Sequence, residues 1–156
     1  MRLLFLFLLL LSQNAFADTG LPVPRFVSLR ANQVNMRTGP GTRYPVEWVF
    51  LKSDLPVEII EEFEHWRKIR DFHGKTGWVH QQMLSGRRMV RVKQNTVLPR
   101  AASVVSVPIA KVEALAVGKI MMCPAGLDLC KVDFSDTQGW IRRDKIWGVY
   151  PQESFE

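Results

Sequence analysis

The sequence carries one pattern twice, and this repeat restricts the fold more than any other feature does. A single shift of the chain against itself superposes similar residues without a gap. The matched pairs are Val34 and Val97, Arg37 and Arg100, Pro45-Val46 and Pro108-Ile109, Val57 and Ile120, and Ile69 and Val132. After a one-residue deletion, Gly77-Trp78-Val79 meets Gly139-Trp140-Ile141. Chance is the alternative, but the triplet arriving in register favours two copies of one small unit.

Both copies are predicted to consist of short strands, because short segments rich in β-branched and aromatic residues alternate with turn formers. These segments are 46–51, 57–60, 66–69 and 76–80 in the first copy, and 119–123, 130–134 and 139–143 in the second. No window keeps a helical period. The sequence therefore predicts an all-β protein made of two small barrels in tandem.

Two motifs frame the first copy. The opening Asn-x-Arg-x-Gly-Pro-Gly and the closing Gly-x-x-Gly-Trp-Val-x-x-x-x-Leu fall on Asn35, Arg37, Gly39, Pro40, Gly41, Gly74, Gly77, Trp78, Val79 and Leu84. This pair of motifs resembles the bacterial Src-homology-3-like (SH3b) domain, and the chain as a whole is similar to exported bacterial proteins with two such domains. The resemblance implies one SH3-like domain at residues 26–86 and a second, diverged one at 87–150. It also implies a binding module, often for peptidoglycan or peptide segments, and no particular activity.

The first 17 residues are predicted to be a cleavable signal peptide. Arg2 precedes an apolar run from Leu3 to Leu11, and Ala15-Phe16-Ala17 has the small-x-small pattern of a cleavage site. The run is far shorter than the roughly 20 residues of a membrane-spanning helix. We therefore expect a periplasmic or secreted protein with no stable membrane span after cleavage; an uncleaved tether is the alternative.

The charge and the cysteines agree with export. The formal net charge is +6. In an exported protein this charge argues against nucleic acid as a partner and suits anionic polymers, lipid headgroups or acidic proteins. The alternative is that the charge only keeps the protein soluble. Cys123 and Cys130 flank a Pro-Ala-Gly turn. In an oxidising compartment they are expected to form a disulfide that closes a hairpin and stabilises the fold by about 2–3 kcal/mol. A metal site would need more ligands nearby.

The loop around Gly39-Pro40-Gly41 is predicted to be a structural turn. It lacks the Lys-Ser/Thr of a phosphate-binding loop and leads into a strand. Pro40 presets φ and Gly41 allows a positive φ, so a type II turn is expected. Gly77 is assigned to the same class of turn residue. In the resembled fold this corner lies beside the ligand groove.

A ligand groove is therefore expected on the first domain. Its candidate residues are Arg37, Arg43, Tyr44, Trp48 and Trp66. Aromatic rings can dock sugars or prolines, and arginines can pair with carboxylates. In the second copy the repeat places Ala102, Val104, Val107, Lys111 and Leu129 opposite Gly39, Gly41, Tyr44, Trp48 and Trp66, whereas Trp140 matches Trp78. The alternative is that each aromatic belongs to a core or to the interface between the domains.

No catalytic residue, cofactor or metal ligand is predicted. The cysteines lie in the second copy and the histidines, His65, His73 and His80, in the first, so a thiol–imidazole pair is not expected. Glu61 and Glu62 are neighbours on a strand and point to opposite faces. We expect a non-enzymatic module that binds peptidoglycan or an envelope protein. The alternative is a structural or adaptor protein, in which Trp147 and Tyr150 either pack onto the barrels or form a partner surface.

Overall fold

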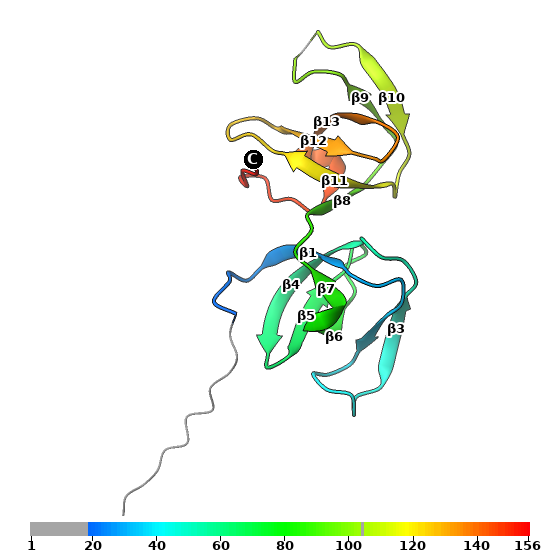
Figure 1. The fold of residues 1–156 in the computed structure, drawn as a ribbon, viewed down its shortest axis with the longest axis vertical. Coiled ribbons are helices and arrows are strands. Elements are labelled where there is room, and N and C mark those ends of the chain that lie inside the picture. The colour runs from blue at the N-terminus through cyan, green and yellow to red at the C-terminus, as the bar shows by residue number, and fades with distance from the viewer. Residues whose placement is uncertain (1–18, 104) are drawn as a thin grey trace, which may run out of the picture.

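The structure is a computed structural model that describes residues 19–103 and 105–156; the predicted signal peptide at 1–17 lies outside the described residues. Two compact bodies follow one another along the chain (Figure 1). The described elements are fourteen strands and two short 3-10 turns, which confirms the predicted all-β class. No helix among the described residues has the length and apolar character needed to cross a bilayer.

The N-terminal half is one antiparallel sheet of seven strands in the order β3-β2-β6-β5-β4-β1-β7. Its elements are β1 (Arg25–Leu29), β2 (Val34–Arg37), β3 (Val46–Phe50), β4 (Pro56–Phe63), β5 (Trp66–Arg70), β6 (Thr76–His80), the 3-10 turn η1 (Gln81–Met83) and β7 (Leu84–Ser85). The four strand segments predicted for this half are all present. Turn formers at Ser53-Asp54, Glu64-His65 and Phe72-His73-Gly74 separate these strands.

The C-terminal half has a five-stranded sheet, β13-β12-β11-β8-β14, and a two-stranded sheet, β10-β9. Its elements are β8 (Met89–Val92), β9 (Thr96–Pro99), β10 (Pro108–Val112), β11 (Val117–Met122), β12 (Leu129–Asp133), β13 (Gln138–Arg142), the 3-10 turn η2 (Arg143–Lys145) and β14 (Ile146–Trp147). The chain then continues to Phe155, whose backbone pairs with Cys123. The folded part thus extends past residue 150, where the sequence analysis ended the second domain.

Each half has its own hydrophobic core, because alternate strand residues point inward. The first core contains Leu29, Met36 and Ile69, and the second contains Leu98 and Ile120, all 2% exposed or less. The two clusters share no buried residue. Burial therefore stabilises each half from within.

The two halves have the same arrangement of strands. In the loop after β2 and in strand β3, however, the structurally equivalent residues lie one position away from those that the sequence repeat matched. The loop after β2 is closed by Thr38 N–H donating to Pro45 C=O, and the loop after β9 by Arg100 N–H donating to Val107 C=O. Met36 lies opposite Trp48 just as Leu98 lies opposite Ala110. Trp48 therefore corresponds to Ala110 and not to Lys111.

The same register corrects two further pairs. Tyr44 N–H donates to Gly41 C=O, and Ser106 N–H donates to Ser103 C=O. Tyr44 thus corresponds to Ser106, not Val107, and Gly41 to Ser103; the Val104 first matched to Gly41 lies outside the described residues. The sequence match failed here because side chains alternate between the two faces, so a slip of one residue can still align apolar residues with one another.

The two halves meet at a cluster of aromatic rings. Phe26 packs against Trp147 and Tyr150, with ring centroids 5.0 and 4.7 Å apart. Tyr150 Oη donates to Glu58 Oε1 at 2.8 Å. Trp147 also meets Phe72 edge-on at 5.9 Å. Trp147 and Tyr150 therefore pack back onto the N-terminal half, which is the first of the two alternatives that the sequence analysis gave for them.

Candidate functional site

The N-terminal half carries a hollow of about 300 Å³ on the outer face of its sheet, which we call the outer-face hollow. Its lining residues are Gln33, Asn35, Arg37, Thr42, Trp66, His80 and Met83. Strands β2, β5 and β6 supply most of them, because their inward positions are filled by the core and the alternate positions face outward. Arg37 and Trp66 are the only two of the five predicted groove residues in this lining.

Trp66 forms the aromatic wall of the outer-face hollow. It lies directly across from His80 in the β5–β6 ladder, and the two rings meet edge-on with centroids 5.4 Å apart. His80 Nδ1 accepts a hydrogen bond from Gln82 N–H at 3.3 Å. A neutral His80 therefore carries its proton on Nε2, where it is available as a donor. The Trp66 side chain is half-buried.

Arg37 has two functions in this geometry. Its Nη1 donates to the carbonyls of Thr42 and Tyr44, at 3.2 and 2.8 Å, and so ties the loop to strand β2. Among the described residues no hydrogen bond holds its Nε or Nη2. The guanidinium is therefore fixed on one side and has donors left for an anionic group on the other.

Tyr44 packs on the glycine loop instead of lining the hollow. A Cβ on Gly39 would lie 2.5 Å from the Tyr44 ring. Arg43 stands over the same ring at 5.0 Å and donates to Tyr44 Oη at 3.1 Å. The predicted type II turn is wrong, since Gly41 does not have a positive φ. The loop needs its first glycine for ring packing, and a tight turn is made by Gly41 N–H donating to Gly39 C=O across Pro40.

Gly77 is also placed differently from the prediction. It lies inside strand β6 and not in a turn. A Cβ there would come within 2.5 Å of the Met36 side chain and 3.0 Å of Arg37 C=O. Gly77 therefore lets β2 approach β6 beneath the hollow.

Trp48 lies in a second hollow of about 280 Å³, away from Trp66. Residues that share this space with Trp48 include Leu51, Leu55, Phe72 and, from the C-terminal half, Arg91. Trp48 is 45% exposed, and Lys75 Nζ stands 4.5 Å above its ring. The five predicted groove residues thus fall into three places: the outer-face hollow, the loop and this second hollow.

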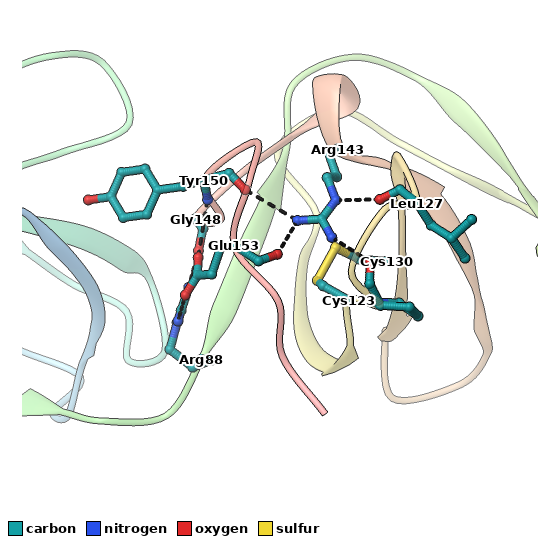
Figure 2. The surroundings of a disulfide bond; sticks show 9 residues. Arg88, Cys123, Leu127, Cys130, Arg143, Gly148, Tyr150 and Glu153 are labelled. Carbon is teal, nitrogen blue, oxygen red and sulfur yellow. Dashed lines mark hydrogen bonds and ion pairs between the residues drawn. A yellow bond between two sulfur atoms is a disulfide. The ribbon is translucent and has the colours of Figure 1, made fainter.

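The predicted disulfide between Cys123 and Cys130 is confirmed, with both sulfurs fully buried. Figure 2 shows it beside Arg143, whose guanidinium donates to the carbonyls of Leu127 and Pro124 in the hairpin turn. The same guanidinium donates to the carbonyls of Tyr150 and Glu153 in the tail. A buried arginine therefore joins the disulfide hairpin to the C-terminal tail.

Sequence reasoning missed Asn35, Thr42 and His80 as hollow residues. The alternation of β2 was a usable signal for Asn35, which faces outward next to Arg37. Nothing in the sequence pattern reveals that Thr42 and His80 line the same hollow. Across residues 19–103 and 105–156 no three metal-binding side chains gather at one point.

One comparison with known protein families concerns the N-terminal half. The sequence profile of a family described as "Bacterial SH3 domain" matches residues 30–86. No curated protein sequence matches the chain. Two solved structures, of NlpC2 and NlpC1 from Trichomonas vaginalis, align over 80% and 84% of this chain at 14% and 13% identity, with TM-scores of 0.36 and 0.37. The chain spans 48% of the length of each of those two proteins. Residues 30–86 form a bacterial SH3 domain.

Proposed function

We propose that this protein is a non-enzymatic binding module of the bacterial cell envelope, and that its outer-face hollow recognises peptidoglycan or a peptide segment of an envelope protein. Domains of the matched family are commonly modules that bind the cell wall. A disulfide fits a location outside the cytoplasm, periplasmic or secreted. We further propose that the C-terminal half is a diverged second copy of the domain, and that it supports the N-terminal half structurally.

The observation that carries the proposal is the pairing of Trp66 with Arg37 in one hollow. A half-buried ring offers a rigid apolar surface on which a sugar or an apolar side chain can stack. The free donors of Arg37 suit a carboxylate, such as those of peptidoglycan stem peptides or an acidic side chain. His80 Nε2 and the Asn35 amide add hydrogen-bonding groups at the rim.

A pull-down with purified murein sacculi tests this assignment. The variant is Trp66→Leu, because leucine stands at the corresponding position, Leu129, in the C-terminal half. The matched control is Trp48→Ala, which removes a ring from the other hollow. We expect Trp66→Leu to weaken retention at least about tenfold, which corresponds to the loss of one aromatic contact, and Trp48→Ala to leave it unchanged. Equal retention of both variants would refute the hollow as the binding site.

The absence of catalysis is part of the proposal and has its own test. Both cysteines are joined, and the described carboxylates Glu58, Glu61 and Glu62 are engaged with arginine or lysine. We expect no muropeptide release when the protein is incubated with sacculi and the supernatant is analysed by chromatography. Release that a buffer control does not show would make the protein a hydrolase.

A structural or adaptor function is the second candidate. The packing of Trp147 and Tyr150 onto Phe26 favours it, because the C-terminal half then serves to hold the N-terminal half rigidly. In this case the outer-face hollow has no ligand, and neither sacculi nor muropeptides would be retained by the unmodified protein.

A further inference from the structure

Strand β3 is an open edge of the N-terminal sheet. It stands at one end of the strand order and pairs with β2 alone within the described residues, whereas the other end is the two-residue strand β7. A bulge at Glu47 interrupts the pairing. The segment Trp48–Leu51, which we call the β3 edge, comprises the part of the strand after the bulge and the residue that follows it, and can offer outward backbone groups to another strand.

Three of the four side chains of the β3 edge are exposed and apolar, whereas Phe50 points into the core. Trp48 is 45% exposed, Val49 39% and Leu51 76%. Protein edges are usually protected from pairing by charged residues, and this edge lacks a charge between Glu47 and Lys52. Exposure of this kind on an edge strand marks a site of strand addition.

The C-terminal half supplies an internal comparison at the same place. The register places Ala110, Lys111 and Glu113 at the positions of Trp48, Val49 and Leu51. There the edge carries small or charged residues, which is the ordinary protection. The barrel architecture therefore does not require an apolar edge, and the apolar residues of β3 need another explanation.

The second hollow adjoins this edge and can accept a side chain. Its wall includes Trp48, Leu55 and Phe72, and its volume is about 280 Å³. Arg91 enters from the C-terminal half and lies 4.8 Å from the centroid of the Phe72 ring. A strand added along β3 would direct alternate side chains toward this hollow.

The charge around the β3 edge is mainly positive. Lys75 stands over Trp48, Lys52 follows the edge and Arg91 lies in the hollow. The buried carboxylate of Asp71 is already occupied, since its Oδ1 accepts the backbone N–H groups of His73 and Lys75 at 2.9 and 2.8 Å. Lys52 and Lys75 are exposed and are available to an acidic partner, whereas Arg91 is half-buried and is attracted by Asp71.

We propose that the β3 edge binds an acidic, extended segment of a partner protein, which adds to the sheet as a further strand. Backbone hydrogen bonds would supply affinity, and the hollow beside Trp48 would select an apolar side chain between acidic ones. Pairing of two copies of this chain along the same edge is an outcome that the experiment below separates from binding of an acidic partner. This inference concerns a different surface from the outer-face hollow and does not rest on binding of the cell wall.

A defined peptide tests the proposal on the purified protein. The probe is a fluorescent octapeptide that alternates glutamate and valine; the controls are its lysine–valine counterpart and a peptide of four glutamates followed by four valines. We expect only the alternating acidic peptide to bind, to shift the amide resonances of Trp48–Leu51, and to slow hydrogen exchange at Val49 and Leu51. The Trp48→Ala variant should bind at least about tenfold more weakly, whereas Trp66→Leu should bind unchanged.

Each other outcome would overturn the inference. Equal binding of the block peptide would show charge attraction without strand addition. Equal loss with Trp66→Leu would move the site to the outer-face hollow. Self-association that sedimentation detects, and that Trp48→Ala abolishes, would make a second copy the occupant. If the circular dichroism spectrum of Trp48→Ala equals that of the unmodified protein, unfolding is excluded as the cause of lost binding.

Discussion

The two halves close the same hairpin with different chemistry. Between β4 and β5, Arg67 Nε lies 3.2 Å from Glu62 Oε1, with both side chains nearly buried. Between β11 and β12, the corresponding positions are Cys123 and Cys130, which form the disulfide. The registers agree, since Glu61 faces Lys68 just as Met122 faces Lys131, and each strand has a bulge one residue earlier. One backbone arrangement therefore accepts an ion pair or a covalent bond.

A buried guanidinium holds the hairpin turn in both halves, but it comes from different positions. Arg67, on a strand, donates to the carbonyls of Glu64 and Trp66 at 2.8 Å and to Gln81 Oε1 at 2.7 Å. In the C-terminal half the donor is Arg143, the first residue of η2, which is the place of Gln81 in η1. Both halves thus place a buried guanidinium at the turn carbonyls, although different elements supply it.

The presence of Cys123 at the position of Glu62 also explains why the tail packs against the C-terminal half. Arg25 and Arg88 occupy equivalent places, each opposite an isoleucine at the bulge. Arg25 pairs with Glu62 at 2.5 Å. Where a cysteine replaces that glutamate, Arg88 pairs with Glu153 of the tail, its Nη2 lying 2.9 Å from Oε2 (Figure 2).

The largest expected effect comes from removing Arg143. We expect Arg143→Met to lower the free energy of unfolding by about 3–5 kcal/mol, because it leaves several buried carbonyls without a donor. Urea unfolding followed by tryptophan fluorescence measures the loss. The neighbour Arg142, which is exposed and paired with Asp144, is the control, and Arg142→Met should change stability little. Similar effects of the two substitutions would contradict the role assigned to Arg143.

Removal of the disulfide should have the next largest effect. Cys123→Ala combined with Cys130→Ala is expected to cost about 2–3 kcal/mol, because the bond closes only a short loop. Arg143 remains to hold the turn, so the double variant should still fold. Urea unfolding of this variant is compared with that of the unmodified, oxidised protein, both without reducing agent. A loss greater than that of Arg143→Met would show that the covalent bond, and not the guanidinium, is the main clamp.

The loops after β2 and β9 permit a smaller test. Gly39 lies under the Tyr44 ring, whereas the equivalent positions, Ala101 and Ser106, have a Cβ and no ring. Gly39→Ala should therefore cost about 1–3 kcal/mol through overpacking. In a Tyr44→Ser background the same substitution should cost under about 0.5 kcal/mol. A double-mutant cycle by thermal unfolding checks this, and additive effects would refute the steric explanation.

Much of this fold could be predicted from sequence, because alternation and turn formers act locally. The strands around Trp66 and Trp78 and the Cys123–Cys130 bond were found in this way. The site was predicted less well. Trp48 and Trp66 lie in the same half but line different hollows. The bulge at Glu47 helps to decide the direction in which the Trp48 side chain points. Bulges and tertiary approach are set by contacts distant in sequence, which a pattern of residue types does not contain.

The smallest expected effect is a dependence of stability on acidic pH that both halves share. Burial raises the pKa of Glu62 and Glu153, but hydrogen bonds outweigh it, from Arg25 and Thr19 to Glu62 and from Arg88 and Tyr150 to Glu153, so that both pKa values lie below the usual 4.5. The unfolded chain therefore binds more protons in acid, and the stabilisation is complete above about pH 4.5 and is lost as the pH falls through the lowered values. Unfolding in urea between pH 6 and 3 should show this fall, less steeply in Glu62→Gln and in Glu153→Gln. An unchanged slope in Glu153→Gln alone would mean that the tail carboxylate does not replace the missing glutamate of the C-terminal hairpin.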